Sequence, residues 1–304
     1  MKAENKTDPY QDLIHYLPQP WPEGLKVYTW PPEAAEKAED FPVGERLFFV
    51  SEDVAPEQVL TAALNQGVSH LCQLGNPFSP QEMLTASLML NRPEEVLDKP
   101  FAAFVDPQSF DKVSEEDCID FEGEFDSIND KSPFLQSLEE FLAQQVPAAS
   151  LRSDVLSIVD ELYTNVIFNA PFVSEENLNP KVERTMDASL PPVYPKARLK
   201  MAIRESQITL GCEDFFGALP IPNLLSKVLS CYQKGIDASM NMGVGGAGIG
   251  SYMIFEASAS YSLLVQPGQK TLIICRLPAK MSQRSRQALS KNIHFLQGTK
   301  KEKK

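Results

Sequence analysis

The chain has 304 residues, of which 43% are hydrophobic and 23% are charged, and this composition with this length predicts two globular domains. The formal net charge of −13 argues against nucleic acid or an anionic membrane as the main partner, because both require a basic surface. Five scattered cysteines and three scattered histidines exclude a Cys/His zinc site on spacing and offer no disulfide framework, which predicts a reducing, cytoplasmic location.

The first part of the chain alternates short apolar runs with helical patterns. Residues 1–24 are polar and rich in proline and predict an extended lead-in without the apolar core of a signal peptide. Residues 25–105 predict a small α/β domain with a parallel sheet. We expect strands at 25–30, 47–50, 70–74 and 101–105, and helices at 56–66 and 79–91, with Ser79 as the N-cap of the second helix.

The alternation in residues 25–105 resembles a receiver domain. Asp53 follows the second predicted strand and would then be the phosphoacceptor, but the acidic residues that a receiver carries after its first strand are missing here. The alternative interpretation is a divergent domain for interaction or sensing. We therefore expect a divergent, receiver-like α/β domain that serves for interaction.

The remaining chain divides into three parts. Residues 106–131 are acidic with little apolar periodicity and predict a linker, whereas the basic residues 281–304 predict either a docking tail or a frayed terminus. Between them, 132–280 predicts a two-layer α/β sandwich with a mainly antiparallel sheet, because its strands are joined as hairpins. The expected helices are 133–145, 153–169, 222–232 and 251–260, and the expected hairpins are 198–204 with 207–211 and 262–265 with 271–276.

A glycine-rich segment stands out in this second domain. Five of the 15 glycines lie within eight residues, namely Gly243, Gly245, Gly246, Gly248 and Gly250. The segment matches G-x-G-x-x-G, but no strand precedes it and no Asp or Glu occurs from 257 to 301, which excludes a dinucleotide-binding fold. Ser251 stands where a P-loop needs lysine. The loop can bind phosphate at the helix N-terminus, or it can be a hinge or a packing site.

The helix predicted at 153–169 carries a polar stripe. Glu161, Asn165 and Asn169 are spaced four residues apart and therefore share one face. Asn165 can offer its amide oxygen to Mg²⁺, and Glu161 can orient or deprotonate a water or a hydroxyl. The alternative is the ordinary polar face of an amphipathic helix.

The order of these motifs resembles one family. The run E-L-Y-T-N-x-x-x-N, the Asp214-x-x-Gly217 that follows a strand, the glycine loop entering a helix and the closing hairpin resemble the Bergerat-type, histidine kinase-like ATPase domain. Histidine kinases, gyrase and heat-shock chaperones share this domain, and the anti-sigma-factor serine kinases look most similar. The resemblance covers about residues 131–280 and implies ATP and Mg²⁺ as cofactors.

The resemblance also implies a role for each matching residue. Glu161 would be the general base, Asn165 the Mg²⁺ ligand and Asn169 a residue near the phosphates. Asp214 would accept the adenine amino hydrogen, and Gly217 would make room for the base. The phosphate loop would comprise Gly245, Gly246, Gly248 and Gly250, with Gly243 at its start.

The chain departs from the family's pattern in two places. Phe215 and Phe216 stand inside the usual D-x-G-x-G motif, where they would narrow the adenine slot or pack beneath it. No histidine occurs between 106 and 150, which argues against a histidine kinase.

The sequence thus predicts an ATP-binding signalling protein that phosphorylates serine or threonine of a regulatory protein. The partner would be a sigma factor or an anti-anti-sigma-like protein, and a homodimer is a further candidate assembly. The alternatives are an ATP-dependent protein-binding switch without catalysis and a degenerate scaffold without nucleotide.

Overall fold

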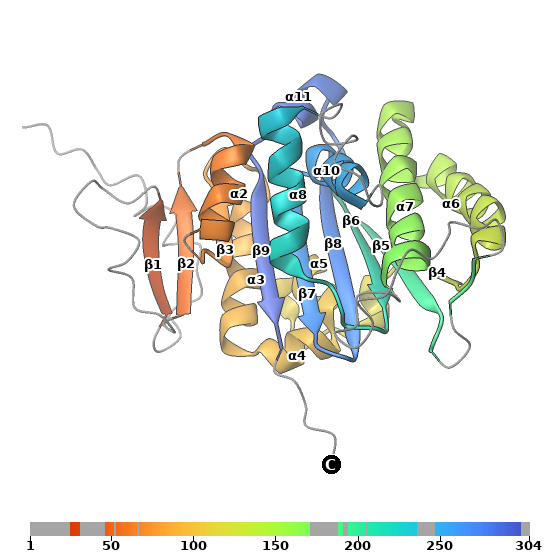
Figure 1. Ribbon diagram of the computed structural model, residues 1–304, viewed down its shortest axis with the longest axis horizontal. Helices are drawn as coiled ribbons and strands as arrows, with labels where there is room; N and C mark the ends of the chain where they lie inside the picture. The colour runs from red at the N-terminus through yellow and green to blue at the C-terminus, as the bar shows by residue number, and fades with distance from the viewer. Residues whose placement is uncertain are drawn as a thin grey trace, which may run out of the picture.

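The computed structural model describes residues 25–30, 46–51, 53–65, 67–170, 188–190, 194–204, 206–235 and 247–298. These residues form a mixed α/β fold around one nine-stranded sheet with the order β1-β2-β3-β9-β7-β8-β6-β5-β4 (Figure 1). The strands are β1 (Leu25–Trp30), β2 (Arg46–Ser51), β3 (His70–Gln73), β4 (Phe121–Phe125), β5 (Ala197–Arg204), β6 (Gln207–Asp214), β7 (Ser260–Gln266), β8 (Lys270–Pro278) and β9 (Asn292–Gln297). The helices are α2 (Pro56–Asn65), α3 (Ser79–Asn91), α4 (Pro93–Asp98), α5 (Pro100–Val105), α6 (Lys131–Gln145), α7 (Ala149–Asn169), α8 (Ile221–Lys234), α10 (Ala247–Ala257) and α11 (Gln283–Gln287).

The sheet joins both ends of the chain through β9. Strands β1, β2 and β3 are parallel and follow one another in chain order. Strands β7, β8, β6, β5 and β4 pair antiparallel, as the predicted hairpins require. Strand β9 lies between the two groups, antiparallel to β3 and parallel to β7. The C-terminal strand is therefore the link that makes one sheet from two groups of strands.

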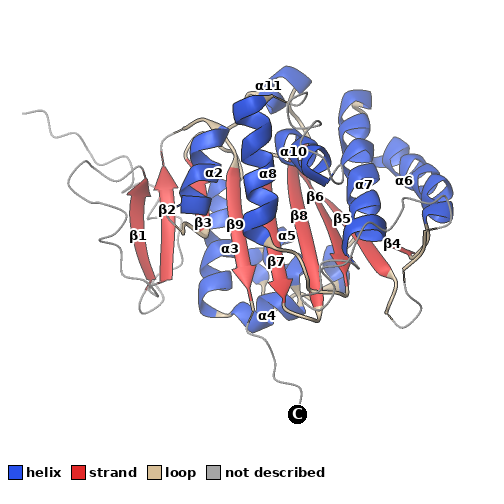
Figure 2. Cartoon of the chain, viewed as in Figure 1, coloured by secondary structure: helices blue, strands red, loops and turns tan. Residues whose placement is uncertain are grey.

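Helices cover both faces of this sheet, which corrects the two-layer prediction. Helices α2, α6, α7, α8 and α10 pack on one face, whereas α3, α4 and α5 pack on the other (Figure 2). Strand β8 is apolar on both sides, because Cys275 and Leu277 face the first group of helices while Leu272 and Ile274 face the second. A strand that is apolar on both faces must be covered twice, and helices of the N-terminal part supply the second cover.

Two local predictions in the N-terminal part are wrong. The run at 101–105 belongs to helix α5 and is not a strand. Pro100 begins the helix, a position that proline favours. All residues of the run are buried, so its apolar pattern has no periodicity that separates a helix from a strand. Phe78 and not Ser79 occupies the N-cap of α3, because the Ser79 hydroxyl instead donates to the Gln73 carbonyl oxygen at 2.6 Å.

The receiver-like prediction for residues 25–105 is not supported. The strand beside β3 is β9, which runs antiparallel to it and comes from the far end of the chain. Asp53 follows β2 and is exposed, and its Oδ1 accepts a hydrogen bond from the Gly75 N–H at 2.8 Å. The structure therefore gives this part a different strand arrangement from the one that the alternation of elements suggested.

The acidic segment 106–131 contains strand β4, so the prediction of an unstructured linker is wrong there. Strand β4 pairs antiparallel with β5. The acidic side chains around it face basic side chains of β5, as in the ion pairs Glu124–Arg198, Asp120–Arg204 and Glu115–Lys200. The concentration of acids therefore complements a basic strand instead of marking an extended connection.

The basic segment 281–304 is likewise built into the fold as far as residue 298. The Arg286 guanidinium is buried and pairs with Asp154 in the first turns of α7 at 2.5 Å. Lys291 Nζ donates to the carbonyl oxygens of Glu256 and Ser258 at 2.6 and 2.8 Å, where a cation stabilises the C-terminal end of α10. The prediction of a docking tail or a frayed terminus is therefore wrong for these residues.

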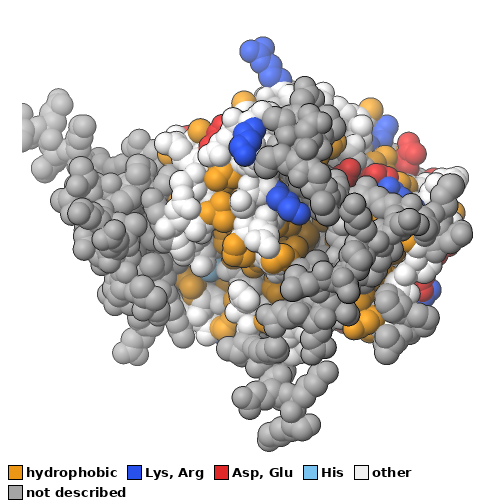
Figure 3. Space-filling view, in the orientation of Figure 1, with side chains coloured by type: hydrophobic (Ala, Val, Ile, Leu, Met, Phe, Trp, Pro, Cys, Tyr) orange, Lys and Arg blue, Asp and Glu red, His pale blue; other side chains and the backbone are white. Residues whose placement is uncertain are grey.

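The types of side chain exposed over the helices α2, α6, α7 and α8 change from one end of this helical layer to the other. On the face seen in Figure 3, hydrophobic side chains gather over α2 and α8, whereas acidic side chains lie over the side of α6 and α7. Among the described residues, none of the helices combines the length and the apolar character needed to cross a bilayer.

Candidate functional site

Helix α7 carries the predicted polar stripe next to its buried face. Its apolar residues Val155, Val159 and Leu162 are at most 1% exposed. Asn165 and Asn169 are half-buried on the same side of the helix, and Asn169 Nδ2 donates to Asn165 Oδ1 at 2.8 Å. The two asparagines of the stripe are therefore connected to each other rather than separately solvated.

Glu161, the first residue of this stripe, lies against the start of α10. A Cβ atom added to Gly250 would be only 2.0 Å from Glu161 Oε2, so the carboxylate occupies the space that a side chain would take. Helix α10 begins at Ala247, four residues before the predicted start at 251, so Gly248 and Gly250 belong to its first turn and not to the loop before it. Gly243, Gly245 and Gly246 lie outside the described residues.

Asp214 ends β6 in a buried position. Its side chain is 7% exposed, and its Oδ1 accepts a hydrogen bond from the Phe216 N–H at 2.9 Å. Burial raises the pKa of this carboxyl to about 6, although the N–H groups of Phe216 and Gly217 act in the opposite direction. The carboxylate is therefore buried with less compensation than its charge requires.

Gly217 has a conformation and a position that only glycine fits. Its φ is +58°, in the left-handed region, and an added Cβ would lie 2.1 Å from the Gln266 carbonyl oxygen. Gly268 N–H donates to the Gly217 carbonyl oxygen at 3.1 Å, which ties the residue to the turn between β7 and β8. The predicted Asp-x-x-Gly motif thus holds a buried acid beside a close backbone contact.

The two phenylalanines between Asp214 and Gly217 both have partners in the segment that enters β5. The Phe215 ring lies under the Arg198 guanidinium, whose carbon is 5.5 Å from the ring centroid. The Phe216 ring packs on Tyr194 with the centroids 4.5 Å apart, and it also contacts the core on the α7 side of the sheet.

One residue of this site was missed by sequence reasoning. Thr271 of β8 is buried and lies directly opposite Asp214 in the β6–β8 register. Its hydroxyl is among the groups that lower the pKa of Asp214 against the larger effect of burial. The sequence predicted a strand at 271–276, paired with 262–265 in a hairpin. It did not predict that this strand also pairs with β6, because β6 belongs to another hairpin and no short-range pattern in the sequence indicates that pairing.

The predicted site residues therefore fall into two groups. Glu161, Asn165 and Asn169 belong to α7, and Glu161 meets α10, while Asp214 and Gly217 meet the β7–β8 turn. Helix α7 itself contacts both α10 and β6, so the two groups lie on adjoining elements.

The sequence matches no known protein family and no curated protein.

Proposed function

We propose that residues 131–280 form a Bergerat-type ATP-binding domain and that the protein is a serine/threonine protein kinase of the anti-sigma-factor type. The observation that carries this proposal is the contact between the Glu161 carboxylate and Gly250 at the start of α10. It brings the predicted general base to the helix N-terminus that would receive the phosphates. The antiparallel strands from β7 to β4, with α6, α7, α8 and α10 on one face, are the sandwich that this domain would use.

The adenine end of the proposed site is Asp214. A buried carboxylate with a pKa of about 6 gains from a further hydrogen-bond donor, and the amino group of adenine is such a donor. The resemblance gives Gly217 the role of making room for the base, but the backbone of the β7–β8 turn takes the space where its side chain would stand. Asp214 is therefore the residue at this end that would recognise the base.

The phosphate end is the first turn of α10. The free N–H groups and the positive dipole end of a helix N-terminus bind anions, and a phosphate would approach this turn beside the Glu161 carboxylate, which takes the space next to Gly250. Asn165 Oδ1 accepts from Asn169 but has a second lone pair, which would hold Mg²⁺. Bound Mg-ATP supplies the transferable phosphoryl group with part of its charge neutralised.

Glu161 has the catalytic part in this proposal. Its carboxylate would accept the proton of a serine or threonine hydroxyl of the partner, and bound ATP would supply the γ-phosphoryl group to that oxygen with ADP as the leaving group. The partner would be a regulatory protein of the cytoplasm, such as a sigma factor or an anti-anti-sigma-like protein.

The kinase proposal is tested by calorimetry and by phosphate transfer. Calorimetric titration with Mg-ATP should give binding by wild type and by Glu161→Gln, and much weaker binding by Asn165→Ala. Radiolabelled ATP with candidate partner proteins should label a partner with wild type and not with Glu161→Gln. Absence of ATP binding by the folded wild type would leave a degenerate scaffold and would overturn the proposal.

A second candidate function is a switch without catalysis, and one contact favours it. The Tyr232 hydroxyl near the end of α8 donates to the Glu256 carboxylate of α10, so these two helices are coupled. Nucleotide at the start of α10 would then alter the surface of α8, as far as its affinity differs between the two states. In this case Glu161→Ala keeps ATP-dependent partner binding, Asn165→Ala loses the ATP dependence, and no partner is labelled.

A further inference from the structure

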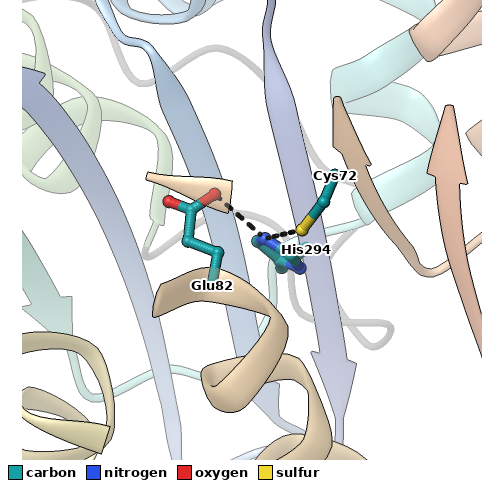
Figure 4. A group of neighbouring side chains, drawn as sticks. All are labelled: Cys72, Glu82 and His294. Atoms are coloured by element: carbon teal, nitrogen blue, oxygen red, sulfur yellow. Dashed lines mark hydrogen bonds and ion pairs between the residues drawn. The ribbon is translucent and has the colours of Figure 1, made fainter. Parts of the chain in front are cut away.

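A second cluster of chemically active side chains lies where β3, β9 and helix α3 meet. None of these elements carries a residue of the proposed ATP site. Cys72 of β3, Glu82 of α3 and His294 of β9 point toward one another and define the Cys–Glu–His cluster (Figure 4). All three side chains are fully buried. One ligand atom of each lies within 4.8 Å of the others.

We propose that Cys72 Sγ, Glu82 Oε2 and His294 Nε2 bind one divalent transition-metal ion, with zinc as the expected occupant. Thiolate, imidazole and carboxylate are the three ligand types that zinc takes in proteins. The spacing of residues along the chain excluded such a site, but the pairing of β3 with β9 brings residues 72 and 294 together. The site is separate from the proposed nucleotide site and does not rest on it.

The distances within the cluster match the spacing of metal ligands. His294 Nε2 is 3.4 Å from Glu82 Oε2, which is long for a hydrogen bond between an imidazole and a buried carboxylate. Zinc holds nitrogen and oxygen ligands at about 2.0–2.2 Å, which sets them about 3.4 Å apart in a tetrahedron. Cys72 Sγ lies 3.9 Å from His294 Nε2, near the roughly 3.6 Å edge that a sulfur–nitrogen pair requires.

The groups around the cluster hold the ligands in the orientation that a metal needs. His294 Nδ1 is 3.4 Å from His70 Nδ1, so a proton on His294 Nδ1 points at His70 and leaves Nε2 to face the thiol and the carboxylate. Arg276 Nη1 pairs with Glu82 Oε1 at 3.2 Å, so the cation holds the outer oxygen. Glu82 Oε2 accepts from the Asn292 side-chain amide and turns its other lone pair toward the cluster. Such outer partners fix the ring and carboxylate orientation of metal ligands.

Binding changes the protonation of one ligand. The Cys72 thiol loses its proton to solvent when the sulfur–metal bond forms, since the thiolate is the ligand. The ion would then join β9 to β3 and α3, which lie about 200 residues earlier in the chain, and would stabilise the central position of β9. The competing interpretation is a metal-free polar network in which Arg276, His294 and the side-chain amide of Asn292 balance Glu82.

Metal analysis of the full chain distinguishes these interpretations. The chain is produced in medium supplemented with Zn²⁺ and, separately, with Co²⁺, purified without chelator and measured by plasma mass spectrometry. We expect on the order of one ion per folded chain, and a thiolate-to-cobalt charge-transfer band in the near ultraviolet for the cobalt form. A folded wild type with less than about 0.1 ion per chain overturns the proposal.

Variants locate the ion within the chain. Cys72→Ser keeps the shape of the side chain, and we expect it to lose the charge-transfer band and at least about tenfold in metal content. Cys212→Ala is the matched control, because Cys212 is also buried but lies on β6 away from the cluster. Equal metal content or an unchanged band in Cys72→Ser and wild type would place the ion elsewhere and overturn the proposal. Circular dichroism confirms that each variant is folded, and the cobalt spectrum of wild type decides the question if Cys72→Ser does not fold.

Discussion

Asp214 and Glu82 are both buried carboxylates of this molecule, and their surroundings differ. At Glu82 burial alone would raise the pKa, but a hydrogen bond from His294 and the charges of Arg276 and His294 outweigh burial and lower the pKa to about 2. At Asp214 burial prevails and the pKa rises to about 6, because only weaker donors such as backbone N–H groups face it. The neighbours of Glu82 therefore keep its carboxylate ionised, whereas the undercompensated Asp214 gains from a further hydrogen-bond donor.

Removing the cation beside Glu82 should have the largest effect on stability. Arg276 is 1% exposed and pairs with a carboxylate that is fully buried, so Arg276→Met leaves a buried charge without its partner. We expect a loss of about 3–5 kcal/mol in the free energy of unfolding, measured by urea denaturation. Arg198→Met is the control, because its ion pair with Glu124 is largely exposed and should contribute no more than about 1 kcal/mol. Similar losses in both variants would refute the contrast.

Gly217→Ala should have the next largest effect. The left-handed φ costs about 1 kcal/mol for alanine, and the contact of its Cβ with the Gln266 carbonyl oxygen adds about 1–3 kcal/mol, because that backbone cannot move aside easily. Gly268→Ala has a similar φ of +70° with open space around the added Cβ, and it should cost only the first part. Equal thermal unfolding of the two variants would show that the close contact is unimportant.

Asp214→Asn should stabilise the protein in a pH-dependent manner. Because the pKa of Asp214 is raised on folding from its usual 3.8 to about 6, its contribution to stability is complete below the unfolded value and is lost as the pH rises through about 6. Asparagine cannot ionise, so the variant should be more stable than wild type by about 1–3 kcal/mol at about pH 8, and the gain should vanish near pH 4. Unfolding curves at both pH values measure this difference. A variant that is less stable than wild type at about pH 8 would contradict an undercompensated carboxylate.

Gly250→Ala should change stability least. The group that an added Cβ meets is the flexible end of Glu161, and alanine favours a helix by up to about 1 kcal/mol over glycine, so the free energy of unfolding should stay within about 1 kcal/mol of wild type. The Glu161 carboxylate must move, however, and phosphate transfer to a partner should fall at least about tenfold if Glu161 is the base. Ser251→Ala is a control in the same helix. Unchanged transfer by Gly250→Ala would argue against a catalytic position for Glu161.

Much of the secondary structure and part of the candidate site could be predicted from local patterns. The hairpins and the apolar face of α7 follow from periodicity and turn residues, and they are confirmed. The helix after the glycine segment is present as α10, but it begins at Ala247 and so takes in the last two glycines. The Asp-x-x-Gly motif also stands where a strand ends, as expected. The run at 101–105 failed because a short, wholly apolar segment has no periodicity that separates helix from strand.

The sequence by itself determined the local elements and the chemical types of the candidate site residues, because each of these depends on neighbours a few positions apart. Only the tertiary structure decided that β9 lies inside the sheet, that helices cover both faces, and that Cys72, Glu82 and His294 meet. These contacts join residues that are distant along the chain, and no short-range pattern encodes a strand's partner. The physical reason is that pairing and burial are settled by the whole set of apolar faces that must be covered together.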